Sequence, residues 1–153
     1  FHSNENQLKL LLKNYSKECK LSLYDSEVAR GLDKLREILK DIPWLIVSGG
    51  DQSELKEVFK YKNISELFNG GIFGSPDKKI DILKREISNG LIKYPSLMFG
   101  DSKLDHIAAK SQKIDFLFVS QWTDFKEYLP YCKNNSINII KSVYDFVEIS
   151  NQI

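Results

Sequence analysis

The chain has 153 residues, of which 42% are hydrophobic and 28% are charged. This length and composition are typical of one folded domain and exclude an intrinsically disordered chain. Lysine and arginine number 22 against 21 aspartates and glutamates, a formal net charge of +1. That balance excludes a polyanion-binding surface built by bulk charge, so we expect no nucleic-acid or membrane partner. The two distant cysteines, Cys19 and Cys132, favour a reducing compartment, and we expect a cytoplasmic protein.

The first forty residues predict two helices. From Asn4 to Lys20 the apolar side chains recur at steps of three and four, which places them on one face of a helix. A second helix is predicted from Ser26 to Lys40, because Ser26 is a suitable N-cap and an apolar stripe follows it.

From Pro43 onward, strands and helices alternate. Short apolar runs typical of buried strands occur at residues 43–47, 71–73, 95–99 and 116–119, and residues 137–140 predict a last edge strand. Segments with helical spacing follow them, at residues 52–60, around 80–87, and at 102–113, 124–131 and 142–149. This alternation predicts an α/β fold: a doubly wound, mostly parallel Rossmann-like sheet with helices on both faces. Ligands of such sheets bind outside the carboxyl ends of the strands, so the polar residues there are the candidates.

Two carboxylates follow the strand predicted at residues 95–99. Asp101 stands at the sheet edge, and Asp105 comes four residues later on the first turn of the next helix. Two hard oxygen ligands at this spacing can face one spot and hold Mg²⁺ beside a phosphate. Alternatively, Asp101 caps the helix and Asp105 is a solvated acid of its first turn.

Ser48, Gly49 and Gly50 close the first predicted strand. A hydroxyl followed by glycines and a helix N-terminus can cradle a phosphate through its oxygen and the backbone N–H groups. The alternative is that Ser48 caps the helix and the glycines only form the turn. The segment is not a Walker A loop, because no Gly-Lys-Ser/Thr follows it.

Lys78 and Lys79 lie near the start of the helix predicted around residues 80–87. A cation there opposes the helix dipole, and a bound phosphate would explain its presence. Because 19 of the 22 basic residues are lysine, the alternative is that the pair belongs to an ordinary surface turn.

Taken together, these three motifs resemble the haloacid dehalogenase superfamily of phosphohydrolases in their order and position. In this resemblance Ser48 corresponds to the hydroxyl residue of motif II. Lys79 corresponds to the lysine of motif III, with Lys78 as the alternative register, and Asp101 and Asp105 correspond to the acidic pair of motif IV.

The resemblance implies a Mg²⁺-dependent phosphatase that acts on a small phosphorylated metabolite through an aspartyl-phosphate intermediate. It implies catalytic roles for Lys79, Ser48 and Asp105. It implies phosphate binding by Ser48, Gly49 and Lys79, and metal binding by Asp101 and Asp105, with orientation of Lys79 as the alternative role of Asp105.

One family motif has no counterpart in this sequence. Motif I is an Asp-x-Asp that supplies the nucleophile on the central strand, and the sequence contains no Asp-x-Asp. We therefore expect the nucleophile on an N-terminal fragment that partners this chain, and we expect the chain alone to be inactive. Residues 1–22 resemble the end of an inserted helical cap, and residues 23–153 the core without its first strand.

Two other functions stay open on the sequence alone. The chain fits a non-catalytic relative that keeps a phosphate or Mg²⁺ site and works as a binding or scaffold module. It also fits another doubly wound domain, such as a phosphoacceptor receiver, although a receiver carries its acidic pair earlier in the chain.

Overall fold

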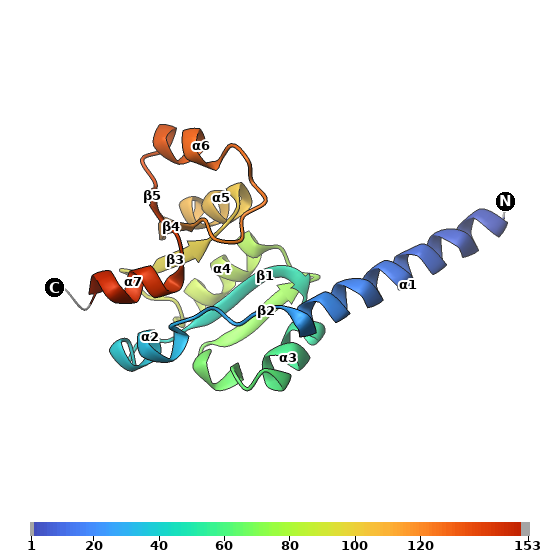
Figure 1. The fold of residues 1–153 in the computed structure, drawn as a ribbon, viewed down its shortest axis with the longest axis horizontal. Coiled ribbons are helices and arrows are strands. Elements are labelled where there is room, and N and C mark those ends of the chain that lie inside the picture. Colours follow the sequence, from blue (N-terminus) through green and yellow to red (C-terminus); the bar gives the residue numbers. More distant parts are fainter. Residues whose placement is uncertain (1, 151–153) are drawn as a thin grey trace.

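The computed structural model describes residues 2–150 (Figure 1). Its helices and strands alternate from residue 45 onward. In chain order the elements are α1 (His2–Asp25), α2 (Leu32–Ile38), β1 (Leu45–Asp51), α3 (Gln52–Tyr61), the 3₁₀ helix η1 (Ser65–Leu67), β2 (Gly71–Ser75), α4 (Lys79–Ser88), β3 (Leu97–Gly100), α5 (Lys103–Ser111), β4 (Asp115–Val119), α6 (Tyr128–Asn134), β5 (Asn138–Ile140) and α7 (Val143–Ser150). Residue 1 and residues 151–153, the outer ends of the two predicted domains, lie outside the described residues.

All the strand pairs are parallel, which confirms the predicted α/β class, but they form two sheets. One sheet has the order β1-β2 and the other the order β3-β4-β5. In the first sheet Leu45 pairs with Gly71, and in the second Leu97 pairs with Asp115. Within the described residues, β1 and β3 do not pair with each other.

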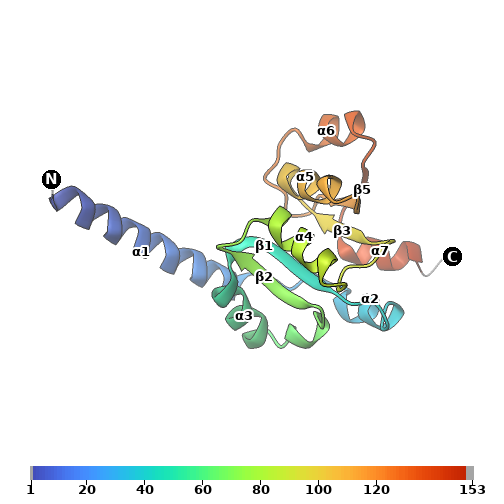
Figure 2. The same cartoon turned by 180° about the vertical axis from the view of Figure 1, so that it is seen from behind.

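The two sheets nevertheless share one hydrophobic core. Leu83 of α4 and Ala108 and Ala109 of α5 form a buried cluster. Val47 of β1 and Met98 of β3 both pack against this cluster. Strands β1 and β3 therefore pack against the same layer of helices, formed by α4 and α5. Figure 2 shows α4 of this layer in front of β1. Because β1 and β3 share this helical layer but do not pair, the two sheets together resemble one parallel sheet that is divided between β1 and β3.

The division explains why β1 and β3 are less buried than predicted. No residue of either strand is fully buried, and Leu97 is 46% exposed. By contrast, β4 has a neighbour on each side, and Phe118 in it is 0% exposed. A strand that has helices on its faces but no strand on one side leaves its apolar side chains partly exposed on that side.

The prediction that Ser26 caps the second helix is wrong. The hydroxyl of Ser26 donates to the carbonyl of Leu23 and its amide to that of Ser22, so Ser26 completes the last turn of α1. The second helix starts later, after Gly31, whose φ of +89° is a conformation that glycine adopts without strain.

The last turns of α1 dock on α3, while the rest projects away from the body (Figure 1). The Lys20 ammonium lies 2.6 Å from the Glu57 carboxylate, and the rings of Tyr24 and Tyr61 meet edge to face at 4.9 Å. Lys62 donates to the Tyr24 carbonyl at 2.9 Å. No helix in the described part of the chain is long and apolar enough to cross a membrane.

Candidate functional site

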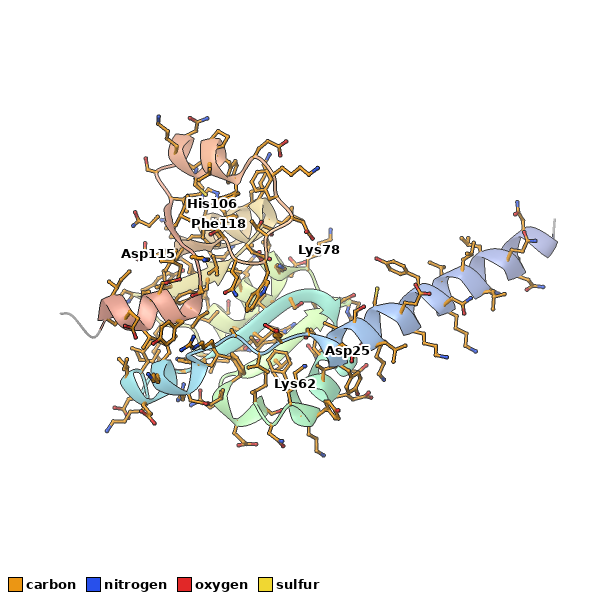
Figure 3. All side chains as sticks on the ribbon, viewed as in Figure 1. Asp25, Lys62, Lys78, His106, Asp115 and Phe118 are labelled. Atoms are coloured by element: carbon orange, nitrogen blue, oxygen red, sulfur yellow. The ribbon has the colours of Figure 1, made fainter. Side chains whose placement is uncertain are left out.

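The carboxyl ends of β1, β2 and β3 share one edge of the fold. Lys79 follows β2 and Asp105 follows β3, and their side chains touch. The carboxyl ends of β2 and β3 therefore lie together, and β1 joins them because it is parallel to β2. In Figure 3 Lys78, just before α4, and Asp115, at the amino end of β4, lie on opposite sides of the body. The edge near Lys78 is on the side from which α1 projects.

Lys79 and Asp105 form the central contact of this edge. The Lys79 ammonium donates to Oδ1 of Asp105 at 2.5 Å. The Asp105 side chain is only 7% exposed and that of Lys79 is 25% exposed. Lys78, the alternative register, is exposed, and its labelled side chain lies at the periphery of the body (Figure 3). The register that brings Lys79 rather than Lys78 to the acidic pair is therefore confirmed.

Ser102 holds the other oxygen of Asp105. Its hydroxyl donates to Oδ2 of Asp105 at 2.7 Å and accepts from the Asp105 amide at 3.2 Å. This reciprocal pair caps α5, so the N-cap is Ser102, and the alternative prediction that Asp101 caps this helix is wrong. Both carboxylate oxygens of Asp105 thus have partners within the chain. This favours the orienting role for Asp105 over direct contact with a metal.

Asp101 differs from Asp105 in that, among the described residues, no ion pair or hydroxyl engages its carboxylate, although the charge of Lys79 acts on it. Among the described residues, the only donor to this carboxylate is its own backbone N–H. Its partial burial, together with the nearby charge of Asp105, raises the pKa of Asp101 above its ordinary value. A carboxylate whose charge is this poorly compensated favours the approach of a cation.

The chain supplies few ligands for that cation. Within residues 2–150 no group of three or more acidic, histidine or cysteine side chains could hold a metal by itself. A site with so few protein ligands suits Mg²⁺, because this ion keeps several waters and is commonly bound by one or two carboxylates plus substrate phosphate oxygens. Asp101 has the free hard oxygens for such a site.

Ser48 and Gly49 lie at the same edge, in an irregular stretch of β1. The pairing of β1 with β2 skips from Val47 to Asp51. The Ser48 hydroxyl accepts from the Gly50 amide at 3.1 Å, and a Cβ at Gly49 would meet nothing within 4 Å. The backbone at Gly49 therefore borders open space, where an anion has room.

The helix after β1 is capped by Asp51, not by Ser48. The Asp51 carboxylate accepts from the Glu54 amide at 3.0 Å and from the Ser53 hydroxyl at 2.5 Å. The reading of Ser48 as a helix cap is therefore wrong. Within residues 2–150, no hydrogen bond or ion pair joins Ser48 to Lys79, Asp101 or Asp105. The structure thus brings Lys79 and Asp105 together and leaves Ser48 on the neighbouring sheet.

Two residues of the site carried no assigned role in the sequence. A Cβ at Gly100 would lie 2.5 Å from that of Asp105, so the absence of a side chain at residue 100 makes room for Asp105. Ser102 could have been found, because Ser-x-x-Asp before an apolar run is close to the capping-box signature. The close approach at Gly100 has no sequence signal.

Comparisons with solved structures agree on the fold. A haloacid dehalogenase-like family hydrolase from Streptococcus pneumoniae superposes with a TM-score of 0.69 at 22% identity, over 89% of this chain and 66% of that one. A predicted phosphatase from Clostridium acetobutylicum gives 0.69 at 19%, over 86% and 63%. A HAD-superfamily hydrolase from Ehrlichia chaffeensis gives 0.62 at 22%, over 97% and 74%.

These similarities show that the chain has the fold of haloacid dehalogenase-like hydrolases. The chain spans about two thirds of the length of the similar structures. No protein-family model and no curated protein matches the sequence.

Proposed function

We propose that the chain is the core of a Mg²⁺-dependent phosphohydrolase that acts on a small phosphorylated metabolite in the cytoplasm. The observation that supports this most strongly is the Lys79–Asp105 pair at the carboxyl edge, together with the Asp101 carboxylate, which forms no ion pair among the described residues. A fixed cation and a free carboxylate at one sheet edge suit the binding of a phosphate together with a divalent metal.

Each residue then has a distinct task. Asp101 would hold Mg²⁺, which when bound offsets the charge of the phosphoryl group. Asp105 fixes the direction of the Lys79 ammonium, which would bind a phosphate oxygen. The Ser48 hydroxyl and the Gly49 amide, at the end of the neighbouring strand, would bind other oxygens of the same phosphate.

The nucleophile would come from a strand that lies between β1 and β3. In the described part of the chain the two strands pack on one helical cluster but do not pair. Each strand therefore leaves a row of backbone donors and acceptors without a strand neighbour there. A parallel strand that ends in an aspartate would satisfy both rows and place its carboxylate between Ser48 and Asp101. Attack on phosphorus by that aspartate would form an aspartyl-phosphate as the ester P–O bond breaks and the alcohol leaves with a proton. Water would then hydrolyse the aspartyl-phosphate to inorganic phosphate and the free carboxylate.

A non-catalytic module that binds phosphate or Mg²⁺ is the second candidate. The observation that favours it is the absence of Asp-x-Asp from the sequence. The two candidates differ in turnover, because both bind a phosphate but only a phosphohydrolase releases it from an ester.

The test uses the whole polypeptide that the gene encodes, with a panel of phosphate esters, Mg²⁺ and EDTA. We expect hydrolysis that EDTA abolishes, and a loss of about a hundredfold or more in kcat/KM for Asp101→Asn. Asp115→Asn, at the opposite edge of the sheet (Figure 3), is the matched control and should keep its activity. Binding of phosphate without turnover of any ester would establish the binding module instead.

A further inference from the structure

A shallow pocket lies against Asp101, and Lys79 is not among the residues that line it. Phe99, Gly100 and Asp101 line it from the end of β3, and Val119 and Trp122 from the end of β4 and the loop that follows. Its volume is about 200 Å³. Since a cavity of about 150 Å³ accepts benzene, the pocket has room for one planar ring. A carboxylate beside apolar walls suits a ligand with a charged end and an apolar end.

Trp122 is the largest of these walls and is held in place by its loop. Its side chain is 50% exposed. On one side of it the amides of Ser120 and Gln121 donate to the carbonyls of Ile140 and Lys141, each at 2.9 Å. Isolated exposed aromatic residues are common on protein surfaces. An indole on a loop tied down next to a candidate metal ligand is a more specific arrangement.

Thr123 ties the other side of the loop to Asp101 itself. Its hydroxyl donates to the Asp101 carbonyl at 2.5 Å and accepts from the Phe125 amide at 3.1 Å. The ring of Phe125 in turn packs edge to face on that of Tyr131 at 5.4 Å. The position of Trp122 is thereby coupled to the backbone of Asp101 by a single side chain, so little conformational entropy is lost when a ligand binds.

We propose that Trp122 contacts the leaving group of the substrate and selects phosphate esters that carry a planar ring, with Thr123 as the residue that positions it. This inference rests on the proposed phosphohydrolase function. The phosphate binds at Lys79 and at the cation that Asp101 would hold, and the ring lies along Trp122 and against Phe99 and Val119. A substrate with a small alkyl leaving group makes no contact with Trp122, so its affinity does not depend on this side chain.

Kinetics of the whole encoded polypeptide test the selection. For Trp122→Ala we expect the KM of phenyl phosphate to rise about fivefold, the size of one aromatic contact, with the KM of methyl phosphate unchanged. Thr123→Val should raise the KM of phenyl phosphate in the same direction, and Thr123→Ser should restore it. Leu129→Ala, which truncates a side chain 58% exposed on α6, is the control. Equal effects of Trp122→Ala on both esters would overturn the proposal.

A binding measurement separates this inference from the proposed function. In protein labelled with fluorotryptophan, the resonances of Trp122 and Trp44 are assigned by their loss in Trp122→Phe and Trp44→Phe. We expect Mg²⁺ with phenylphosphonate to shift the Trp122 resonance and not that of Trp44, methylphosphonate to shift it much less, and Asp101→Asn to abolish the shift. Binding of phenylphosphonate without a Trp122 shift overturns the inference alone. Failure to bind any phosphonate or hydrolyse any ester overturns both.

Discussion

At the scale of single residues, the site depends on Gly100, where any side chain would collide with Asp105. A Cβ on Gly100 would lie 2.5 Å from Cβ and 2.9 Å from Cγ of Asp105, and 2.9 Å from the ring of Phe116. None of these atoms is the end of a flexible side chain, so they could not move aside cheaply. Gly100 therefore allows Asp105 to pack against the end of β3, where it meets Lys79.

Gly100→Ala should displace Asp105 and break its contact with Lys79. We expect the free energy of unfolding to fall by about 1–3 kcal/mol, the usual cost of overpacking, and the activity to fall with it. Urea unfolding and phosphate-ester turnover measure the two effects.

Gly49→Ala is the matched control for stability, because a Cβ at Gly49 meets nothing within 4 Å and its φ is not positive. It should leave the urea midpoint unchanged or raise it slightly. Equal losses of stability in the two variants would show that the contact at Gly100 does not constrain the fold.

At the scale of elements, two helices of the chain start with the same reciprocal cap. Ser102 and Asp105 cap α5 at the site. Ser142 and Asp145 repeat the pattern at α7, where the Asp145 amide donates to the Ser142 hydroxyl at 3.3 Å and the hydroxyl donates back to the carboxylate at 2.6 Å. Because no ion pair engages Asp145 among the described residues, and Lys141 acts on it only as a nearby charge, the second cap is a natural reference for the first.

Substitution of each serine by alanine separates capping from function. Ser142→Ala and Ser102→Ala should each cost about 1 kcal/mol of stability, the usual value of an N-cap. Only Ser102→Ala should also lower phosphatase activity, because Asp105 then loses one of the two groups that orient it. Thermal unfolding and turnover are the measurements. An equal loss of activity in both variants would mean that Ser102 acts only through stability.

The cap of α7 also predicts a dependence of stability on pH. The hydroxyl and amide of Ser142 stabilise the ionised carboxylate, so the pKa of Asp145 lies below its ordinary value of 3.8. The contribution of Asp145 is therefore complete above pH 3.8 and is lost as the pH falls through the lower pKa of the folded state. The difference in urea midpoint between the wild type and Ser142→Ala should shrink from pH 6 to pH 3. A difference that stays constant would contradict this assignment.

At the scale of the whole molecule, local patterns predicted most of the fold. The apolar runs that end at Ser48 and Phe99 are strands, and Lys79 meets Asp105 as the resemblance to the haloacid dehalogenase superfamily implied. The start of α2 was missed because it depends on the conformation of Gly31 rather than on a capping side chain. The loop that places Trp122 was missed because Thr123 bonds to Asp101, 22 residues away, and such tertiary bonds leave no periodic signal.

The divided sheet gives a prediction about architecture. A crystal structure of the whole encoded polypeptide should show a parallel strand between β1 and β3, with an aspartate at its carboxyl end near Asp101. Leu97, now 46% exposed, should become buried, because the strand covers the open side of β3. Direct pairing of β1 with β3 in that structure would refute the proposed position of the nucleophile.

The most direct test of the phosphohydrolase site compares two adjacent lysines of the same polypeptide. Lys79 pairs with the buried Asp105, whereas Lys78 is exposed, so Lys79→Met and Lys78→Met remove the same charge one residue apart. With Mg²⁺ present and folding checked by circular dichroism, Lys79→Met should lower kcat/KM for a phosphate ester by about a hundredfold or more. Lys78→Met should leave kcat/KM near the wild-type value. Equal values of kcat/KM for the two variants would contradict the assignment of Lys79, Asp105 and Asp101 as the site of phosphoryl transfer.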